Sequence, residues 1–160
     1  MEPNMVDKEM QSETYEELIE WTGALHRKLA ERLEQGMDGE PGEKAKWLLE
    51  YLADHERKLN DVVSKISKHG NAGALHTWLY EHLSEKLPAD KRQTLSFVGM
   101  SFEEISEAIM DIHNQLIELY RSAAGRAPTP EVRELMEEML ELEEHETLRL
   151  ASQVDSVRAM

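Results

Sequence analysis

The sequence predicts an all-α fold, in which four long helices form an up-down-down-up bundle built from two repeated helical hairpins. The first observation is composition: among 160 residues there are only eight Gly and five Pro, with 40% hydrophobic and 32% charged residues, as is typical of helical bundles. The second is that four segments repeat apolar residues at helical spacing. The third is an internal repeat, because residues 52–56 read Leu-Ala-Asp-His-Glu and residues 142–146 read Leu-Glu-Glu-His-Glu.

The other two helical segments also correspond to each other. The first opens with Tyr-Glu-Glu-Leu at Tyr15 and the third opens with Phe-Glu-Glu-Ile at Phe102, 87 residues later. His26 and His113 are separated by the same 87 residues, whereas the His-Glu pairs of the second and fourth segments lie 90 residues apart. Helix one therefore matches helix three, and helix two matches helix four.

The first hairpin follows a short leader. Residues 1–12 are predicted to be flexible, and the bundle is predicted to occupy residues 13–158. We expect helix one to begin near Ser12, a suitable N-cap, and to end at the Gly- and Pro-containing stretch before Glu43. Helix two is predicted over residues 43–68.

The connection between the hairpins is long and less regular. Residues 74–87 favour a short extra amphipathic helix, which Pro88 would stop, and residues 94–100 read as an extended crossover. A connection of this length is able to carry the chain along the whole bundle, so that the second hairpin starts at the opposite end.

The second hairpin carries clear helix-start signals. Ser101 and Glu104 form a capping-box pattern at the start of helix three, which we expect to end near Gly125. Thr129 is a predicted N-cap with Pro130 at the first helical position, and helix four is predicted over residues 131–157.

Each predicted helix places polar residues on its otherwise apolar face, near the middle of the segment. Because the midpoints of antiparallel helices lie at one height, these side chains should converge. The six residues are His26, His55, Glu56, His113, Glu143 and Glu146.

Two arrangements would satisfy buried carboxylates, which are costly when left alone. In the first, Glu56 and Glu146 hold a metal ion with His26 and His113, and His55 and Glu143 are additional groups beside them. Imidazole and carboxylate suit iron, manganese or zinc. In the second, each Glu only hydrogen-bonds a His, as a polar layer that fixes the register of the helices.

Composition excludes several other classes of function. The net charge of −15 argues against nucleic acid and anionic membranes as partners, and the lack of Cys excludes disulfides and thiolate sites. The polar first residues and the absence of a long apolar run predict a cytoplasmic protein that does not enter the membrane. Trp21 and Trp47 are expected to face outward on the first hairpin, which predicts a homodimer.

Four long helices, a repeated hairpin and a long crossover resemble the ferritin-like superfamily, which includes rubrerythrins and bacterioferritins. The resemblance implies a di-iron site with Glu on helices one and three and Glu-x-x-His on helices two and four. This chain has His26 and His113 at the first pair of places. At the second pair it has Glu56-x-x-Leu59 and Glu143-x-x-Glu146. The symmetric change favours a two-His, two-Glu site for one metal, or an altered two-metal site.

The resemblance leaves two classes of function open. One is a metal-binding protein, with iron first and manganese or zinc next, that acts as an oxidase, peroxidase or ferroxidase-like oxidoreductase. The other is a non-catalytic ferritin-like bundle with a polar core layer, which acts in stress response or partner binding.

Overall fold

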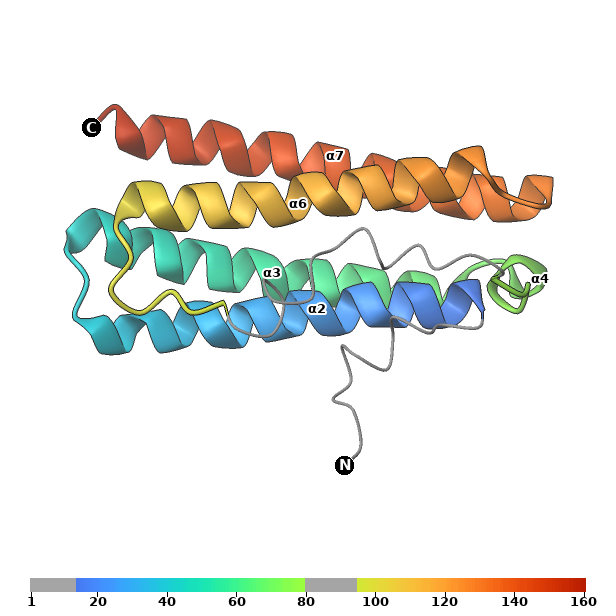
Figure 1. Cartoon of the computed structure of the whole chain (residues 1–160), viewed down its shortest axis with the longest axis horizontal. Helices are drawn as coiled ribbons and strands as arrows, with labels where there is room; N and C mark the ends of the chain where they lie inside the picture. The colour runs from blue at the N-terminus through green and yellow to red at the C-terminus, as the bar shows by residue number, and fades with distance from the viewer. Residues whose placement is uncertain (1–13, 80–94) are drawn as a thin grey trace.

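The computed structural model describes residues 14–79 and 95–160, and the chain over these residues is all-α (Figure 1). No strand occurs among them, apart from an isolated bridge between Thr14 and Trp78. The elements are four long helices, one 3-10 turn and one short helix: α2 (Tyr15–Gln35), η1 (Gly36–Gly39), α3 (Glu43–His69), α4 (Ala72–Leu75), α6 (Phe102–Gly125) and α7 (Pro130–Arg158).

The four long helices lie side by side along the long axis of the molecule (Figure 1). Helices α2 and α3 form one antiparallel hairpin, and α6 and α7 form the other. Helices α2 and α7 run in one direction, whereas α3 and α6 run in the opposite direction. Helix α3 packs on both helices of the second hairpin. Side chains that face inward near the middle of the four helices are therefore brought to one level.

The helix ends follow the capping signals of the sequence with one correction. Thr14, not Ser12, caps α2, since its hydroxyl accepts a hydrogen bond from the Glu17 amide. Ser12 lies outside the described residues, as does the predicted leader over 1–12. The Ser101 capping box and the Thr129 cap with Pro130 at the start of α7 are confirmed.

The extra helix predicted over residues 74–87 is wrong where the structure describes it. Helix α4 covers only Ala72–Leu75, and the chain then turns so that the Thr77 carbonyl accepts a hydrogen bond from the Tyr15 amide. This bond ties the end of the first hairpin to the start of α2, and it needs an extended chain rather than another helical turn. Residues 80–87 lie outside the described residues.

The segment before α6 packs against the turn of the first hairpin. Phe97 is 1% exposed, and the Arg32 guanidinium donates a hydrogen bond to the Leu95 carbonyl. A side-chain carbon added at Gly39 would lie 2.7 Å from the Gly99 amide nitrogen. The absence of a side chain at Gly39 therefore permits this close approach.

The core is mostly apolar, and its buried polar side chains include a group near the middle of the four long helices. Trp21 is completely buried, which corrects the prediction that it faces outward, and Trp47 is partly buried and stacks on Tyr51 with ring centroids 5.0 Å apart. The burial of Trp21 removes part of the apolar surface on which the expected homodimer depended, and the homodimer stays a prediction.

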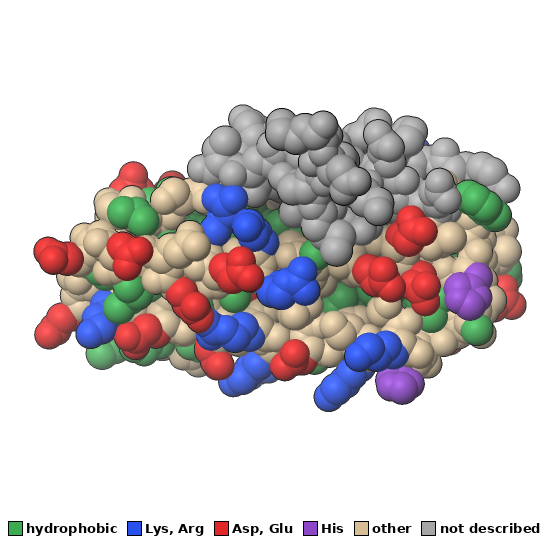
Figure 2. All heavy atoms as spheres, turned by 90° about the horizontal axis from the view of Figure 1, so that it is seen from below, with side chains coloured by type: hydrophobic (Ala, Val, Ile, Leu, Met, Phe, Trp, Pro, Cys, Tyr) green, Lys and Arg blue, Asp and Glu red, His purple; other side chains and the backbone are tan. Residues whose placement is uncertain are grey.

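The surface is strongly charged. Figure 2 shows acidic and basic side chains interspersed over one face of the molecule. Within residues 14–79 and 95–160, no helix combines the length and apolar character needed to cross a bilayer.

Candidate metal centre

Four polar side chains, one from each long helix, meet in the core. They are His26 of α2, Glu56 of α3, His113 of α6 and Glu143 of α7, and none of the four is exposed to solvent. Each lies near the midpoint of its helix, in a face that is otherwise mostly apolar. The sequence positions them because the helical repeat turns these residues to the same side as the buried Leu, Ile and Met residues.

The four side chains form a closed ring of hydrogen bonds. His26 Nε2 lies 2.8 Å from Glu143 Oε1, and His113 Nε2 lies 2.8 Å from Glu56 Oε1. Within each hairpin, His26 Nδ1 lies 3.1 Å from Glu56 Oε2, and His113 Nδ1 lies 3.0 Å from Glu143 Oε2. The ring therefore has the pseudo-two-fold symmetry of the repeat, and both ring nitrogens of each His are used.

The charges of the ring balance one another. Burial alone lowers the pKa of His26, but the carboxylates of Glu56 and Glu143 outweigh burial and raise this pKa to about 9. The pKa of His113 is raised well above its ordinary value by the same two carboxylates, again against the effect of burial. Two imidazolium groups therefore supply four N–H donors, which matches the four oxygens of two carboxylates.

The carboxylates respond in the opposite direction. Burial raises the pKa of Glu143, but the two positive imidazoles lower it overall to about 2. The pKa of Glu56 is lowered below its usual range, since His113 and His26 outweigh the effect of burial there too. The ring is therefore ionised and neutral as a whole, which avoids the cost of an isolated buried charge.

The donor set also fits a divalent cation. One potential ligand atom from each of His26, Glu56 and His113 lies within 4.8 Å of the other two. Glu143 is hydrogen-bonded to both imidazoles. A cation bound by the Nε2 nitrogens would displace their protons. The Nδ1–H groups would stay bonded to the Oε2 oxygens, and such bonds orient metal-ligating imidazoles.

His55 lies beside the ring rather than in it. Its ring centroid is 6.1 Å from that of His113, and its side chain is 9% exposed. Burial lowers the pKa of His55, and its Nε2 atom is buried without a hydrogen-bond partner. This unpartnered nitrogen is an additional candidate donor toward a cation in the ring.

Glu146 lies outside the ring, and Glu143 takes the place that the sequence assigned to it. Glu146 Oε2 lies 3.8 Å from His55 Nδ1, and its other oxygen accepts a hydrogen bond of 3.3 Å from Arg149. His55 and Glu146 line a surface pocket of about 260 Å³ between α3 and α7. The inward face of α7 runs through Met139, Glu143, Thr147 and Leu150, which leaves Glu146 on the flank.

Sequence reasoning missed Tyr120 as a member of this site. It is completely buried, and burial followed by the nearby Glu143 charge raises its pKa. Its position seven residues after His113, on the same helical face, was the available signal. Thr22, which is also completely buried, donates its hydroxyl proton to the Ile19 carbonyl.

Comparison of the chain with protein-family models, curated proteins and solved structures gave no match.

Proposed function

We propose that this chain is a ferritin-like metal-binding protein that holds one divalent cation in the ring formed by His26, Glu56, His113 and Glu143. The observation that carries the proposal is the ring itself. Two imidazoles and two carboxylates from four helices face one another at 2.8 Å, and a second hydrogen bond holds the orientation of each imidazole. Imidazole and carboxylate together suit iron, manganese and zinc.

The arrangement of the helices supports the ferritin-like part of the proposal. The two antiparallel hairpins run in the order up, down, down, up (Figure 1), and each contributes one His and one Glu that lie 30 residues apart in sequence. The symmetry of the ring is the symmetry expected of a duplicated hairpin. His26 and His113 stand where the resemblance implies Glu, so we propose a centre for one metal ion.

The burial of the ring favours a role in holding the cation over turnover of a substrate. Structural metal sites are closed by protein donors, whereas catalytic sites keep one position open. All four side chains are 0% exposed, and the pocket between α3 and α7 is lined by His55 and Glu146 rather than by the ring. An oxidase, peroxidase or ferroxidase-like activity would require one donor to leave the cation, with His55 as the residue placed to replace it.

The test is the melting temperature of the protein with and without iron(II), manganese(II) and zinc(II), together with elemental analysis. We expect one metal ion per chain and a higher melting temperature, because a ligand that binds only the folded state stabilises it by mass action. Glu56→Ala should remove both effects, whereas Glu146→Ala should keep them. A wild-type protein whose melting temperature responds to none of the three metals would overturn the proposal.

One observation favours a second candidate function. The ring satisfies all its donors and acceptors without a cation, since four N–H groups pair with four carboxylate oxygens. Such a closed network would serve as a polar core layer that fixes the register of the helices in a non-catalytic, partner-binding bundle. Under this alternative, no metal changes the melting temperature, and any loss of a ring member destabilises the protein.

A further inference from the structure

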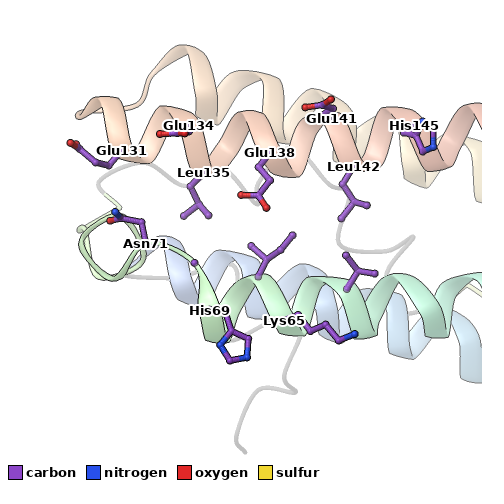
Figure 3. A pocket seen from close by; sticks show the side chains of 13 residues that line it. Lys65, His69, Asn71, Glu131, Glu134, Leu135, Glu138, Glu141, Leu142 and His145 are labelled. Carbon is purple, nitrogen blue, oxygen red and sulfur yellow. The ribbon is translucent and has the colours of Figure 1, made fainter.

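A groove of about 930 Å³ lies between the end of α3 and the start of α7, away from the buried ring (Figure 3). Its floor is apolar and is formed by Val62 and Ile66 of α3 with Leu135 and Leu142 of α7. Figure 3 shows Leu135 and Leu142 pointing from α7 toward α3. Val62 is 39% exposed, which is unusual for an apolar side chain in this protein.

One rim of the groove is acidic. Glu131, Glu134, Glu138 and Glu141 of α7 line it, and Glu138 points into the groove in Figure 3. Within the described ranges, no ion pair or hydrogen bond involves these four carboxylates. By contrast, Glu146 and Asp155 of the same helix pair with Arg149 and Arg158. The rim therefore offers four negative charges that the described chain leaves unpaired.

The apolar floor is elongated along the helix axes. Val62 and Ile66 lie about one turn apart on α3, and Leu135 and Leu142 lie about two turns apart on α7, so that the floor has the long, narrow form of a groove that receives an amphipathic helix. The rim from Glu131 to Glu141 spans about 15 Å at the rise of an α-helix, or nearly three turns. A segment of about ten or more residues would be needed to cover it.

We propose that this groove is a docking site for a basic amphipathic helix of a partner protein. The floor would take the apolar face of that helix, and the acidic rim would pair with its Lys or Arg residues. Charge disfavours a second copy of the chain as the occupant, because each copy carries a net charge of −15. This proposal does not depend on whether the ring holds a metal ion.

The probe is a fluorescent 18-residue peptide of Leu and Lys that forms an amphipathic helix, titrated with the full-length protein by anisotropy. Glu138→Lys should weaken binding about tenfold, because it replaces attraction with repulsion at the groove. Glu137→Lys is the matched control: it makes the same charge change at the neighbouring exposed residue, which does not line the groove. Binding should also weaken as salt is raised.

A second variant tests the floor. Val62→Asn replaces a half-exposed apolar side chain, so that it should weaken binding without changing the melting temperature. A peptide of the same composition with its Leu and Lys order scrambled should bind more weakly to the wild type than the amphipathic peptide. Failure of the amphipathic peptide to bind, equal effects of Glu138→Lys and Glu137→Lys, or equal affinity for the scrambled peptide would each overturn the proposal.

Discussion

At the scale of single residues, the ring depends on complete pairing. Each His donates to two carboxylates and each Glu accepts from two imidazoles, so that every member has two partners within the ring. Removal of one member leaves charged groups in an apolar core without a partner, and the cost of breaking such a pair exceeds what the intact pair contributes. Residues beside the ring, such as Glu146, can be removed without leaving a charged group in the core unpaired.

Glu56→Ala should lower the free energy of unfolding of the metal-free protein by about 3–5 kcal/mol, because two buried imidazolium N–H groups lose their acceptor. Glu146→Ala is the control, with an expected loss of at most about 1 kcal/mol, since Glu146 lies on the flank and pairs with the exposed Arg149. Urea unfolding at pH 6.5, followed by circular dichroism, measures both. Equal losses for the two variants would contradict the ring as the source of stability.

The pH dependence of stability follows from the pKa values of His26 and Glu143. The pKa of His26 rises from 6.5 to about 9, so its stabilisation is complete below pH 6.5 and is lost as the pH rises through 9. The pKa of Glu143 falls from 4.5 to about 2, so its stabilisation is present above pH 4.5 and is lost as the pH falls through 2.

The metal-free protein should therefore melt at a lower temperature as the pH rises from 6.5 to 9.5. The contribution of His26 alone is on the order of 3 kcal/mol, at 1.36 kcal/mol for each unit of pKa difference. His26→Gln should make this part of the profile shallower, because one of the two imidazoles with a raised pKa is gone. A wild-type melting temperature that stays constant from pH 6.5 to 9.5 would show that the imidazoles are not charged in the folded state.

The sequence indicated most of the site but misplaced one residue by a turn. His26, Glu56 and His113 are polar residues at positions where the helical pattern calls for apolar ones, and this was sufficient to predict that their side chains converge. The Leu-x-x-His-Glu similarity suggested a repeat of 90 residues and hence Glu146. In the structure, the residue of the second hairpin that corresponds to Glu56 is Glu143. These two residues lie 87 residues apart in sequence, as His26 and His113 do. If the 87-residue separation of the two His had been applied to Glu56 as well, it would have identified Glu143. The helical pattern could not decide, because it placed both Glu143 and Glu146 on the inner face.

At the scale of helices and turns, local signals in the sequence were the reliable ones. The starts at Ser101 and Thr129 could be predicted because a side-chain oxygen accepts a bond from an amide three residues later, which is a local interaction. The end of α4 at Leu75 could not, because the chain after it makes a contact between Thr77 and Tyr15, which are far apart in sequence. Helical periodicity over residues 74–87 carried no information about that contact.

The hairpin turn between α2 and α3 offers a test of packing at this scale. Gly39→Ala should lower the free energy of unfolding by about 1–3 kcal/mol, because the added carbon would lie 2.7 Å from the Gly99 backbone nitrogen, which has little room to move. Gly42→Ala is the matched control, as a carbon added there has nothing within 4 Å. Thermal unfolding should separate the two variants. Equal stability would mean that the turn and residues 97–100 do not pack as described.

At the scale of the whole molecule, the ring links the two hairpins. Two of its hydrogen bonds lie within a hairpin, and the two shorter ones, from His26 to Glu143 and from His113 to Glu56, cross between hairpins. The four amphipathic segments predicted the hairpins. The way in which one hairpin sits on the other depends on contacts between residues far apart in sequence, and the symmetric polar layer is the feature of the sequence that pointed to it.

The most direct test of the metal centre is the number of protons released when a cation binds. If the ring holds the cation, the Nε2 protons of His26 and His113 must leave, and calorimetry in buffers of different ionisation enthalpy at pH 7 should give one zinc(II) ion per chain with release of close to two protons. His26→Gln should remove the binding. Absence of zinc binding, or binding that releases no proton and persists in His26→Gln, would contradict the ring as a metal site.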